Sequence, residues 1–108
     1  MNVNAINPLS LPSLPVSQRK NLPKTGVIYF VLEGQKLLYI GKAKNLRHRW
    51  NNHKLLNENL NEAAIAWYEL ADEYSRRWTE RSLIRKYEPP FNITDTPRFY
   101  DSVKNNGK

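Results

Sequence analysis

Two short apolar segments stand on either side of a Gly-containing turn in the stretch GVIYFVLEGQKLLYIG, residues 26–41. Residues 27–32 are β-branched, aromatic or apolar at every position, which is typical of an inner strand. Residues 33–35 supply the turn and residues 37–40 the return strand, so this stretch predicts a β-hairpin. Each strand carries one tyrosine, Tyr29 in the first and Tyr39 in the second.

The loop length decides how the two tyrosines lie relative to each other. Residues directly opposite in an antiparallel pair share a face of the sheet. A three-residue loop places Tyr29 opposite Tyr39 with both phenols on one face. A two-residue loop shifts the register by one and sends the two phenols to opposite faces. The sequence permits both lengths, and a site built from both tyrosines requires the odd one.

The rest of the chain is short enough for one small domain, with 108 residues in all. Residues 1–23 hold four of the seven prolines and only scattered Leu and Val. Proline fixes φ and removes a backbone donor, so this stretch predicts a flexible, extended arm. We expect the folded domain to span residues 24–95, and residues 96–108 to form a polar tail.

The balance of charge favours a polyanionic partner. There are 17 Lys and Arg against 10 Asp and Glu, a net charge of +7. Nucleic acid is the expected partner, and a merely soluble basic protein is the alternative. The chain has no cysteine, which excludes disulfides and thiolate metal sites and fits a cytoplasmic location. No apolar run approaches the roughly 20 residues that span a bilayer, and no signal-peptide pattern is present, so we expect neither membrane insertion nor secretion.

A basic segment, GKAKNLRHRW, follows the hairpin and leads into a predicted helix from residue 46 to about 56. Asn45 is a suitable N-cap for this helix. Its apolar side is formed by three residues, namely Leu46, Trp50 and Leu56. Arg49 and His53 lie four residues apart inside the same arc. Because unpaired buried cations are unfavourable, these two side chains either serve a site or extend to solvent at the rim of the core.

Residues 63–70, AAIAWYEL, predict a third strand, and Asp72 can cap a second helix that runs to about residue 87 and stops at the two following prolines. The apolar residues of this helix share one side, and they are Leu83, Ile84 and Tyr87. Glu80 lies in the middle of their arc. Either it serves a site, or it forms an ion pair with Arg76 or Arg85, or it simply lies at the boundary of the core.

These inward-facing polar residues suit phosphodiester cleavage, which needs an oriented water, a base and positive charge beside the phosphorus. An Arg fork matches phosphate geometry, and a carboxylate can hold a divalent cation. A phenol with an ordinary pKa near 10 acts as a base only if nearby positive charge favours phenolate, and Lys42 or the metal could supply it. Nucleophilic Cys, Gly-x-Ser-x-Gly and Walker patterns are absent from the sequence, and His48 and His53 are poorly spaced for zinc.

At these positions the chain resembles the GIY-YIG nucleases, and in particular the N-terminal incision module of the nucleotide-excision-repair endonuclease and its small stand-alone relatives. The resemblance rests on GVIY at 26–29 and YIG at 39–41, followed by KAKNLRHRW. It extends to an arginine ten positions after the second tyrosine, Arg49, and to His53 four residues later. Glu80 ahead of a Leu-Ile pair and a Pro-x-x-Asn ending at Asn92 complete the match over residues 24–94.

The resemblance implies an α/β (α+β) fold with a three-stranded antiparallel sheet flanked by helices, and one Mg²⁺ or Mn²⁺ ion held by Glu80. It implies that Tyr29 acts as general base or positions the water, with Tyr39 orienting water and phosphate. Arg49 would stabilise the charge of the transition state, and His53 would position or relay a proton to Tyr29. The remaining residues would support the site or bind the backbone of the nucleic acid, and they are Gly41, Lys42, Lys44, Arg47 and Asn92.

The expected activity is therefore metal-dependent cleavage of DNA, with RNA not separated from DNA by charge or motif. The alternative is a catalytically idle nucleic-acid-binding module that uses the same basic face. Members of the family usually carry a second domain that selects the substrate, and this chain has no room for one. A tail, a homodimer or a protein partner would then supply specificity, and one active site would nick a single strand.

Overall fold

The computed structural model describes residues 3–51 and 62–92. Its sheet is made of four strands, which are β1 (Ser13–Pro15), β2 (Val27–Glu33), β3 (Lys36–Ala43) and β4 (Ala64–Glu69). The α-helices are α1 (Leu46–Asn51) and α3 (Glu73–Tyr87), and three short 3₁₀ turns lie near the N-terminus, namely η1 (Val3–Ala5), η2 (Pro8–Ser10) and η3 (Val16–Asn21). No helix in these two ranges has the length and apolar character to cross a membrane.

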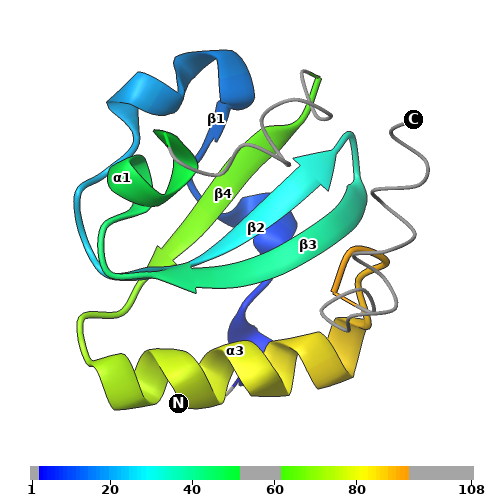
Figure 1. The fold of residues 1–108 in the computed structure, drawn as a ribbon. Coiled ribbons are helices and arrows are strands. Elements are labelled where there is room, and N and C mark those ends of the chain that lie inside the picture. Colours follow the sequence, from blue (N-terminus) through cyan, green and yellow to red (C-terminus); the bar gives the residue numbers. More distant parts are fainter. Residues whose placement is uncertain (1–2, 52–61, 93–108) are drawn as a thin grey trace, which may run out of the picture.

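The sheet is antiparallel and its strands lie in the order β1-β4-β2-β3 (Figure 1). The three strands expected from the sequence are confirmed, with β2 in the interior of the sheet and β3 at one edge. The fourth strand, β1, was not expected. The fold is thus α+β with a four-stranded sheet, and its helices flank the sheet.

The fourth strand comes from the stretch that was expected to be a flexible arm. Leu14 of β1 pairs with Ile65 of β4, and the Val16 backbone N–H donates to the Ala63 carbonyl at 2.9 Å. The side chain of Leu22 is fully buried. Prolines are tolerated here because β1 is an edge strand, where a missing N–H breaks no inner ladder. Scattered apolar residues therefore anchor this segment to the sheet, whereas the prolines had suggested an unattached chain.

The hairpin has a two-residue loop, Gly34 and Gln35, with Glu33 paired to Lys36. Gly34 takes φ +63, a conformation that glycine adopts without strain. Of the two loop lengths that the sequence permits, the structure has the even one, and Tyr29 lies opposite Gly41 rather than Tyr39. A β-bulge nevertheless returns Tyr39 to the face of the sheet that carries Tyr29, because the register shifts by one residue between Val31 and Leu32.

The bulge puts Tyr29 and Tyr39 on the same face of the sheet. Val31 pairs with Tyr39 while Leu32 pairs with Leu37, so Leu38 is the additional residue of β3. From there on, the residues of β3 that face the same way as Tyr29 are Tyr39 and Gly41. The two tyrosines are diagonal neighbours, with ring centroids 6.0 Å apart. The shared face, which a common site requires, is confirmed.

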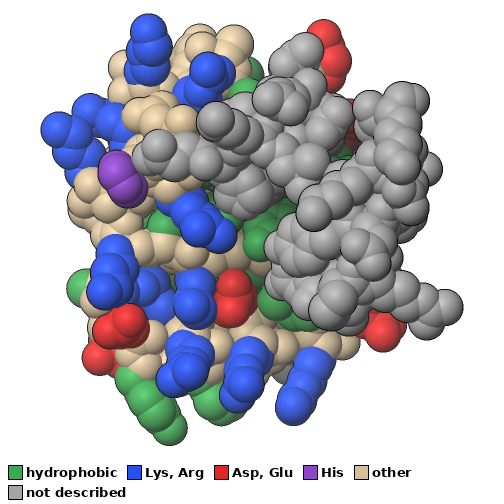
Figure 2. Space-filling view, in the orientation of Figure 1, with side chains coloured by type: hydrophobic (Ala, Val, Ile, Leu, Met, Phe, Trp, Pro, Cys, Tyr) green, Lys and Arg blue, Asp and Glu red, His purple; other side chains and the backbone are tan. Residues whose placement is uncertain are grey.

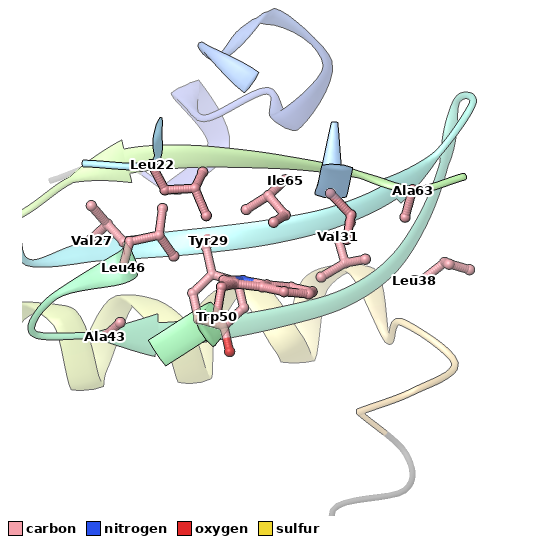
Figure 3. Packing of buried hydrophobic residues seen from close by; sticks show 11 residues of the cluster. Leu22, Val27, Tyr29, Val31, Leu38, Ala43, Leu46, Trp50, Ala63 and Ile65 are labelled. Carbon is pink, nitrogen blue, oxygen red and sulfur yellow. The ribbon is translucent and has the colours of Figure 1, made fainter. Parts of the chain in front are cut away.

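Alternate residues of β2 face two separate apolar clusters. The α1 face is the side covered by η3 and α1, and its cluster contains Val27, Tyr29 and Val31 together with Leu46 and Trp50 (Figure 3). The α3 face is the opposite side, and its buried residues are Ile6, Ile28, Phe30, Leu32, Ile40, Ala66 and Leu83. A small domain with two thin clusters has a small margin of stability.

The helix ends follow the capping residues expected from the sequence. Asn45 accepts a hydrogen bond from the His48 backbone N–H at 3.1 Å, and Asp72 accepts one from the Ser75 N–H at 2.8 Å. These bonds satisfy donors that the first helical turn leaves open. Helix α3 ends at Glu88, which adopts a left-handed conformation ahead of the two prolines. The continuation predicted for the first helix, with His53 and Leu56, lies outside the described residues.

Helix α3 runs alongside the edge strand β3 (Figure 1) and contacts both β3 and β2. Leu83 is fully buried in the α3 face, and Ile84 and Tyr87 pack against the same cluster, as the helical spacing predicted. Because β3 is the outermost strand, a side chain from α3 can pass around its edge toward the α1 face. This position explains how a residue of α3 reaches the tyrosines.

Candidate active site

Tyr29 lies at the centre of the α1 face and is fully buried. The ring of Trp50 meets it edge-on, with centroids 6.1 Å apart and an interplanar angle of 74°. In Figure 3 the Tyr29 oxygen points away from the apolar side chains around it. The aromatic ring thus belongs to the core of the α1 face, while its hydroxyl lies over Gly41 of the edge strand β3.

Because Gly41 has no side chain, it leaves room for the Tyr29 phenol to lie against β3. A Cβ atom at position 41 would lie 2.5 Å from both Cζ and the oxygen of Tyr29, which is far inside van der Waals contact. Any side chain there would displace the phenol. The glycine of the YIG triplet therefore has a steric reason, namely that the opposite tyrosine crosses directly over it.

The hydroxyl of Tyr29 is buried, and within residues 3–51 and 62–92 no group meets hydrogen-bonding geometry with it. Burial raises the pKa of Tyr29 above its ordinary value of 10, because a phenolate would lose its hydration. The Arg49 guanidinium opposes this shift and Glu80 adds to it. The net direction is upward, so Tyr29 is a neutral phenol at neutral pH in the protein alone.

Arg49 extends from α1 to both tyrosines. Although the residue is exposed, its guanidinium lies close enough to the Tyr29 and Tyr39 oxygens to raise the pKa of Arg49, chiefly through Tyr29. The sequence placed Arg49 on the inward arc of this helix, and its contact with the phenols fits that placement. The apolar residues of the same arc, Leu46 and Trp50, are fully buried as expected.

Glu80 acts on the same phenol from helix α3. It lies in the middle of α3, is partly buried, and its charge raises the pKa of Tyr29. Two helices thus present an arginine and a carboxylate to one phenol. The expected ion-pair partner Arg76 has a different role, because it donates to the carbonyl oxygens of Leu70 at 2.9 Å and Ala71 at 2.6 Å.

A groove of about 260 Å³ lies beside this cluster. It runs from the end of β3 (Lys42 to Lys44) past His48 and Arg49 of α1 to Glu73 and Arg76 of α3. Its positive side chains outnumber the single carboxylate of Glu73, and Glu73 itself pairs with Lys44 at 3.9 Å. In Figure 2, Lys and Arg side chains gather on this side of the molecule. A groove of this charge suits a phosphate backbone.

Two of the expected basic residues have positions that change their interpretation. Lys42 pairs with Ile28 and therefore alternates to the α3 face, away from the tyrosines, and the cation that acts on Tyr29 is Arg49. Arg47 donates to the Leu22 carbonyl at 2.8 Å and so ties α1 to the end of η3. Lys42 still lines the groove, as Lys44 does.

Asn92 fixes the segment of β3 between Tyr39 and Gly41. Its side chain accepts from the Ile40 backbone N–H at 2.7 Å and donates to the Ile40 carbonyl at 2.8 Å. The amide thereby substitutes for a neighbouring strand at this edge of the sheet. The Phe91 backbone N–H also donates to the carbonyl of the bulge residue Leu38, at 2.9 Å. Asn92 thus supports the site through the backbone that carries Tyr39.

Glu80 is the carboxylate whose charge acts on Tyr29, so it is the side chain that could hold a metal ion near the phenols. Within the described ranges no group of three or more His, Asp and Glu side chains comes together. Mg²⁺ commonly uses one or two protein carboxylates and takes its other ligands from water and substrate phosphate. A single carboxylate therefore fits an ion such as Mg²⁺, which takes its other ligands from water and phosphate. It does not fit an ion that needs all of its ligands from the protein.

Sequence reasoning missed or misassigned two residues of the site, and one expected residue is outside the described ranges. Trp50 was assigned to the core alone, although it also holds the ring of Tyr29. Arg76 was considered only as an ion-pair partner, and its passage close over Gly26 could have been suspected from the glycine that opens the hairpin. His53 lies outside the described residues.

Comparison with known proteins places this geometry in a family. Residues 24–93 match the model of the UvrC-like GIY-YIG domain. The UvrABC system protein C of Borrelia duttonii (strain Ly) is 37% identical over 86 residues, which is 70% of this chain and 14% of that protein. The corresponding protein of Aquifex aeolicus (strain VF5) is 33% identical over 82 residues, 68% of this chain and 14% of that protein. The chain thus spans about a seventh of the length of these relatives.

A solved structure shares the fold. The GIY-YIG N-terminal endonuclease domain of UvrC from Thermotoga maritima, bound to magnesium as its catalytic divalent cation, superposes with a TM-score of 0.61. The match covers 69% of this chain and 91% of that domain at 23% sequence identity. At this identity the likeness supports the fold and its order of elements.

Proposed function

This chain belongs to the UvrC-like GIY-YIG family, and we propose that it is a divalent-metal-dependent endonuclease that hydrolyses phosphodiester bonds in DNA. The observation that carries the proposal is that Arg49 and Glu80, from two different helices, both act on the pKa of the buried Tyr29 phenol. These three side chains come from α1, α3 and β2, which only the folded sheet brings together. Such a convergence has no role in packing, since the Tyr29 ring alone would fill its place in the core.

Arg49 binds the scissile phosphate in this proposal. A guanidinium offers several donors in a plane, which matches the oxygens of a phosphoryl group as negative charge builds up on them. Tyr39 lies beside Tyr29 and orients the phosphate and the attacking water. Asn92 and Gly41 act indirectly, because they fix the backbone of β3 and the room for the Tyr29 phenol.

Glu80 would hold the divalent cation. When bound, such an ion neutralises the charge on the leaving oxygen and lowers the pKa of nearby groups. The relative from Thermotoga maritima is bound to magnesium, which supports this role for the equivalent site here. The proposed ligand set is Glu80 from the protein, with water and substrate phosphate in the other positions.

Tyr29 either positions the attacking water or removes its proton. Because burial raises its pKa, the phenol is protonated at neutral pH and cannot act as a base unless positive charge favours the phenolate. Arg49 lies close enough to supply part of that charge. His53, four residues after Arg49 in the sequence, is the proposed proton partner of Tyr29.

The proposed substrate is DNA, which is the substrate expected of the GIY-YIG family and suits the basic groove beside the site. The basic groove beside the site would take the phosphates that flank the cleaved bond, with Lys42 and Lys44 on its walls. Arg47 would bind DNA only if it gave up its bond to Leu22. One site per molecule would cut one strand, so a nick is the expected product.

The proposal is tested with supercoiled plasmid and the purified protein. In Mg²⁺ or Mn²⁺ the wild type should convert supercoiled to open-circular DNA, and EDTA should prevent it. Glu80→Ala and Arg49→Ala should each slow the conversion by roughly 10²–10³-fold, as expected for loss of one group that stabilises transition-state charge. Lys36→Ala, at the exposed hairpin loop, serves as the control for loss of a single charge.

Cleavage by Glu80→Ala at the wild-type rate would refute the assignment of the metal ligand. Binding that weakens steeply with salt, together with no metal-dependent cleavage of DNA or RNA, would instead identify a nucleic-acid-binding module without activity. Parallel assays on RNA of the same sequence decide between the two nucleic acids.

A further inference from the structure

The outer face of α3 combines exposed aromatic rings with arginines. Tyr74 is 77% exposed and Trp78 53% exposed, which makes them two of the three large hydrophobic side chains left in solvent within the described ranges. Arg77, Arg81 and Arg85 are exposed on the same helix. At 3.6 residues per turn, all five side chains fall within an arc of about 100°. Together they form what we call the α3 stripe.

The positive charges of the α3 stripe repel one another. Arg77, Arg81 and Arg85 follow at intervals of four residues, so each lies directly above the last. Like charges at this spacing destabilise a helix. In the part of the chain that the structure describes, none of the three forms an ion pair. A ridge of this kind is stabilised by a polyanion lying along it.

The two exposed aromatic side chains indicate more specifically which kind of polyanion the stripe binds. Tyr74 and Trp78 are also one turn apart, so their rings lie one above the other beside the arginine ridge. Bases stack on aromatic rings in proteins that bind single-stranded nucleic acid, and arginines beside them follow the backbone. The bases of an intact duplex are already stacked on each other. Unpaired bases are therefore the ligand that both parts of the stripe fit.

The stripe is continuous with the site described above. Arg77 lies three residues before Glu80 on α3, so the two are neighbours on the helix surface. Lys and Arg side chains extend along α3 next to the groove in Figure 2. Trp78 lies about 160° around the helix from Glu80, so a strand that leaves Glu80 crosses Arg77 before it reaches Trp78.

We propose that the α3 stripe binds an unpaired DNA strand next to the cleaved bond, with bases stacked on Tyr74 and Trp78 and the backbone along Arg77, Arg81 and Arg85. The chain would thus select DNA that has a single-stranded segment at the cleavage point. This inference rests on the proposed function for the position of the cleaved bond. The binding surface itself does not depend on catalysis.

The test measures binding without metal, so that cleavage plays no part. The probes are two fluorescein-labelled DNA hairpins, one blunt and one with a single-stranded thymidine tail, titrated in EDTA and followed by anisotropy. The wild type should bind the tailed probe more tightly than the blunt one. Trp78→Ala should lose roughly tenfold in affinity for the tailed probe alone, which is within the range for one base–aromatic stack.

Two variants serve as controls for Trp78→Ala. Trp78→Phe keeps a stacking ring and should retain most of the preference for the tail. Leu9→Ala removes a side chain that is equally exposed, at 54%, but far from α3 in the sequence, and should change nothing. Arg81→Gln should reduce the salt dependence of binding to the tail by about 0.7 in the slope of log K against log salt, the value for one contact with a single-stranded phosphate.

Equal affinity of wild type and Trp78→Ala for the tailed probe would overturn the proposal. So would a wild-type dimer in sedimentation that Trp78→Ala turns into a monomer, because a second copy would then occupy the stripe. Tail binding that needs Trp78 in a protein that never nicks plasmid would sustain the stripe and refute the nuclease. Nicking that needs Glu80, with no effect of Trp78→Ala on binding, would support the nuclease and refute the stripe.

Discussion

The two faces of the sheet are formed by alternate residues of β2 but differ in their polar content. On the α3 face, Ile28, Phe30 and Leu32 pack against Leu83 and Ile40, and every one of these side chains is apolar. On the α1 face, Tyr29 takes the central position between Val27 and Val31 and brings a hydroxyl with it. The rings of Phe30 and Tyr29 are equally buried. Between these two rings at the centre of the faces, the difference is thus the Tyr29 oxygen and the charged groups that act on it.

This comparison separates stability from activity. On the α3 face a substitution changes only how well the core is filled. On the α1 face, removal of the Tyr29 oxygen leaves the packing of the ring intact and removes the group that Arg49 and Glu80 approach. We therefore expect the first kind of variant to lose stability at constant activity per folded molecule, and the second kind to do the opposite.

Leu83→Ala should have the largest effect on stability. It removes a fully buried side chain from the α3 face and leaves a cavity, which lowers the free energy of unfolding by about 2–5 kcal/mol. Urea unfolding measures the loss, and plasmid nicking at low temperature should show an unchanged rate per folded molecule. A large loss of activity in the folded protein would show that the two faces are not separable.

Asn92→Ala should lower the free energy of unfolding less than Leu83→Ala does. It should also lower the nicking rate. It leaves the Ile40 N–H and carbonyl without the partners they have now, at a cost of about 1–3 kcal/mol. Because Ile40 lies between Tyr39 and Gly41, the nicking rate should fall as well. Asn92→Asp keeps the acceptor for the Ile40 N–H and should lose less in both measurements. Unchanged activity in Asn92→Ala would remove Asn92 from the support of the site.

The smallest expected effect is a dependence of stability on alkaline pH. The pKa of Tyr29 is raised in the folded state by burial, so the neutral phenol is favoured there. Its contribution is fully present below the unfolded pKa near 10 and is lost as the pH rises through the folded pKa, at up to about 1.4 kcal/mol per pH unit. Unfolding of wild type and Tyr29→Phe between pH 8 and 11 should show this slope in the wild type alone. Parallel curves would mean that the Tyr29 hydroxyl is hydrated.

Patterns of local sequence predicted most of the elements correctly. Periodicity and capping residues located β2, β4 and α3 to within a residue or two, and placed Glu80 among the apolar positions of its helix. These features depend on spacing along one segment. The inward arc of Arg49 followed from the same helical geometry.

Features that depend on contacts between distant segments could not be predicted. The bulge at Leu38 arises between two strands, and it turned a loop length that should have separated the tyrosines into one that joins them. The pairing of β1 with β4 involves segments about fifty residues apart, and prolines concealed it. The two bonds between Asn92 and Ile40 likewise join residues far apart in the chain, so no local pattern could predict them.

The most direct test of the central claim is the Tyr29→Phe variant, measured for plasmid nicking and for urea unfolding at pH 7 beside the wild type. We predict that the nicking rate falls by about a hundredfold or more while the free energy of unfolding changes little, because the ring keeps its contacts with Trp50. Wild-type nicking by Tyr29→Phe would contradict the account and reduce Tyr29 to a residue of the core.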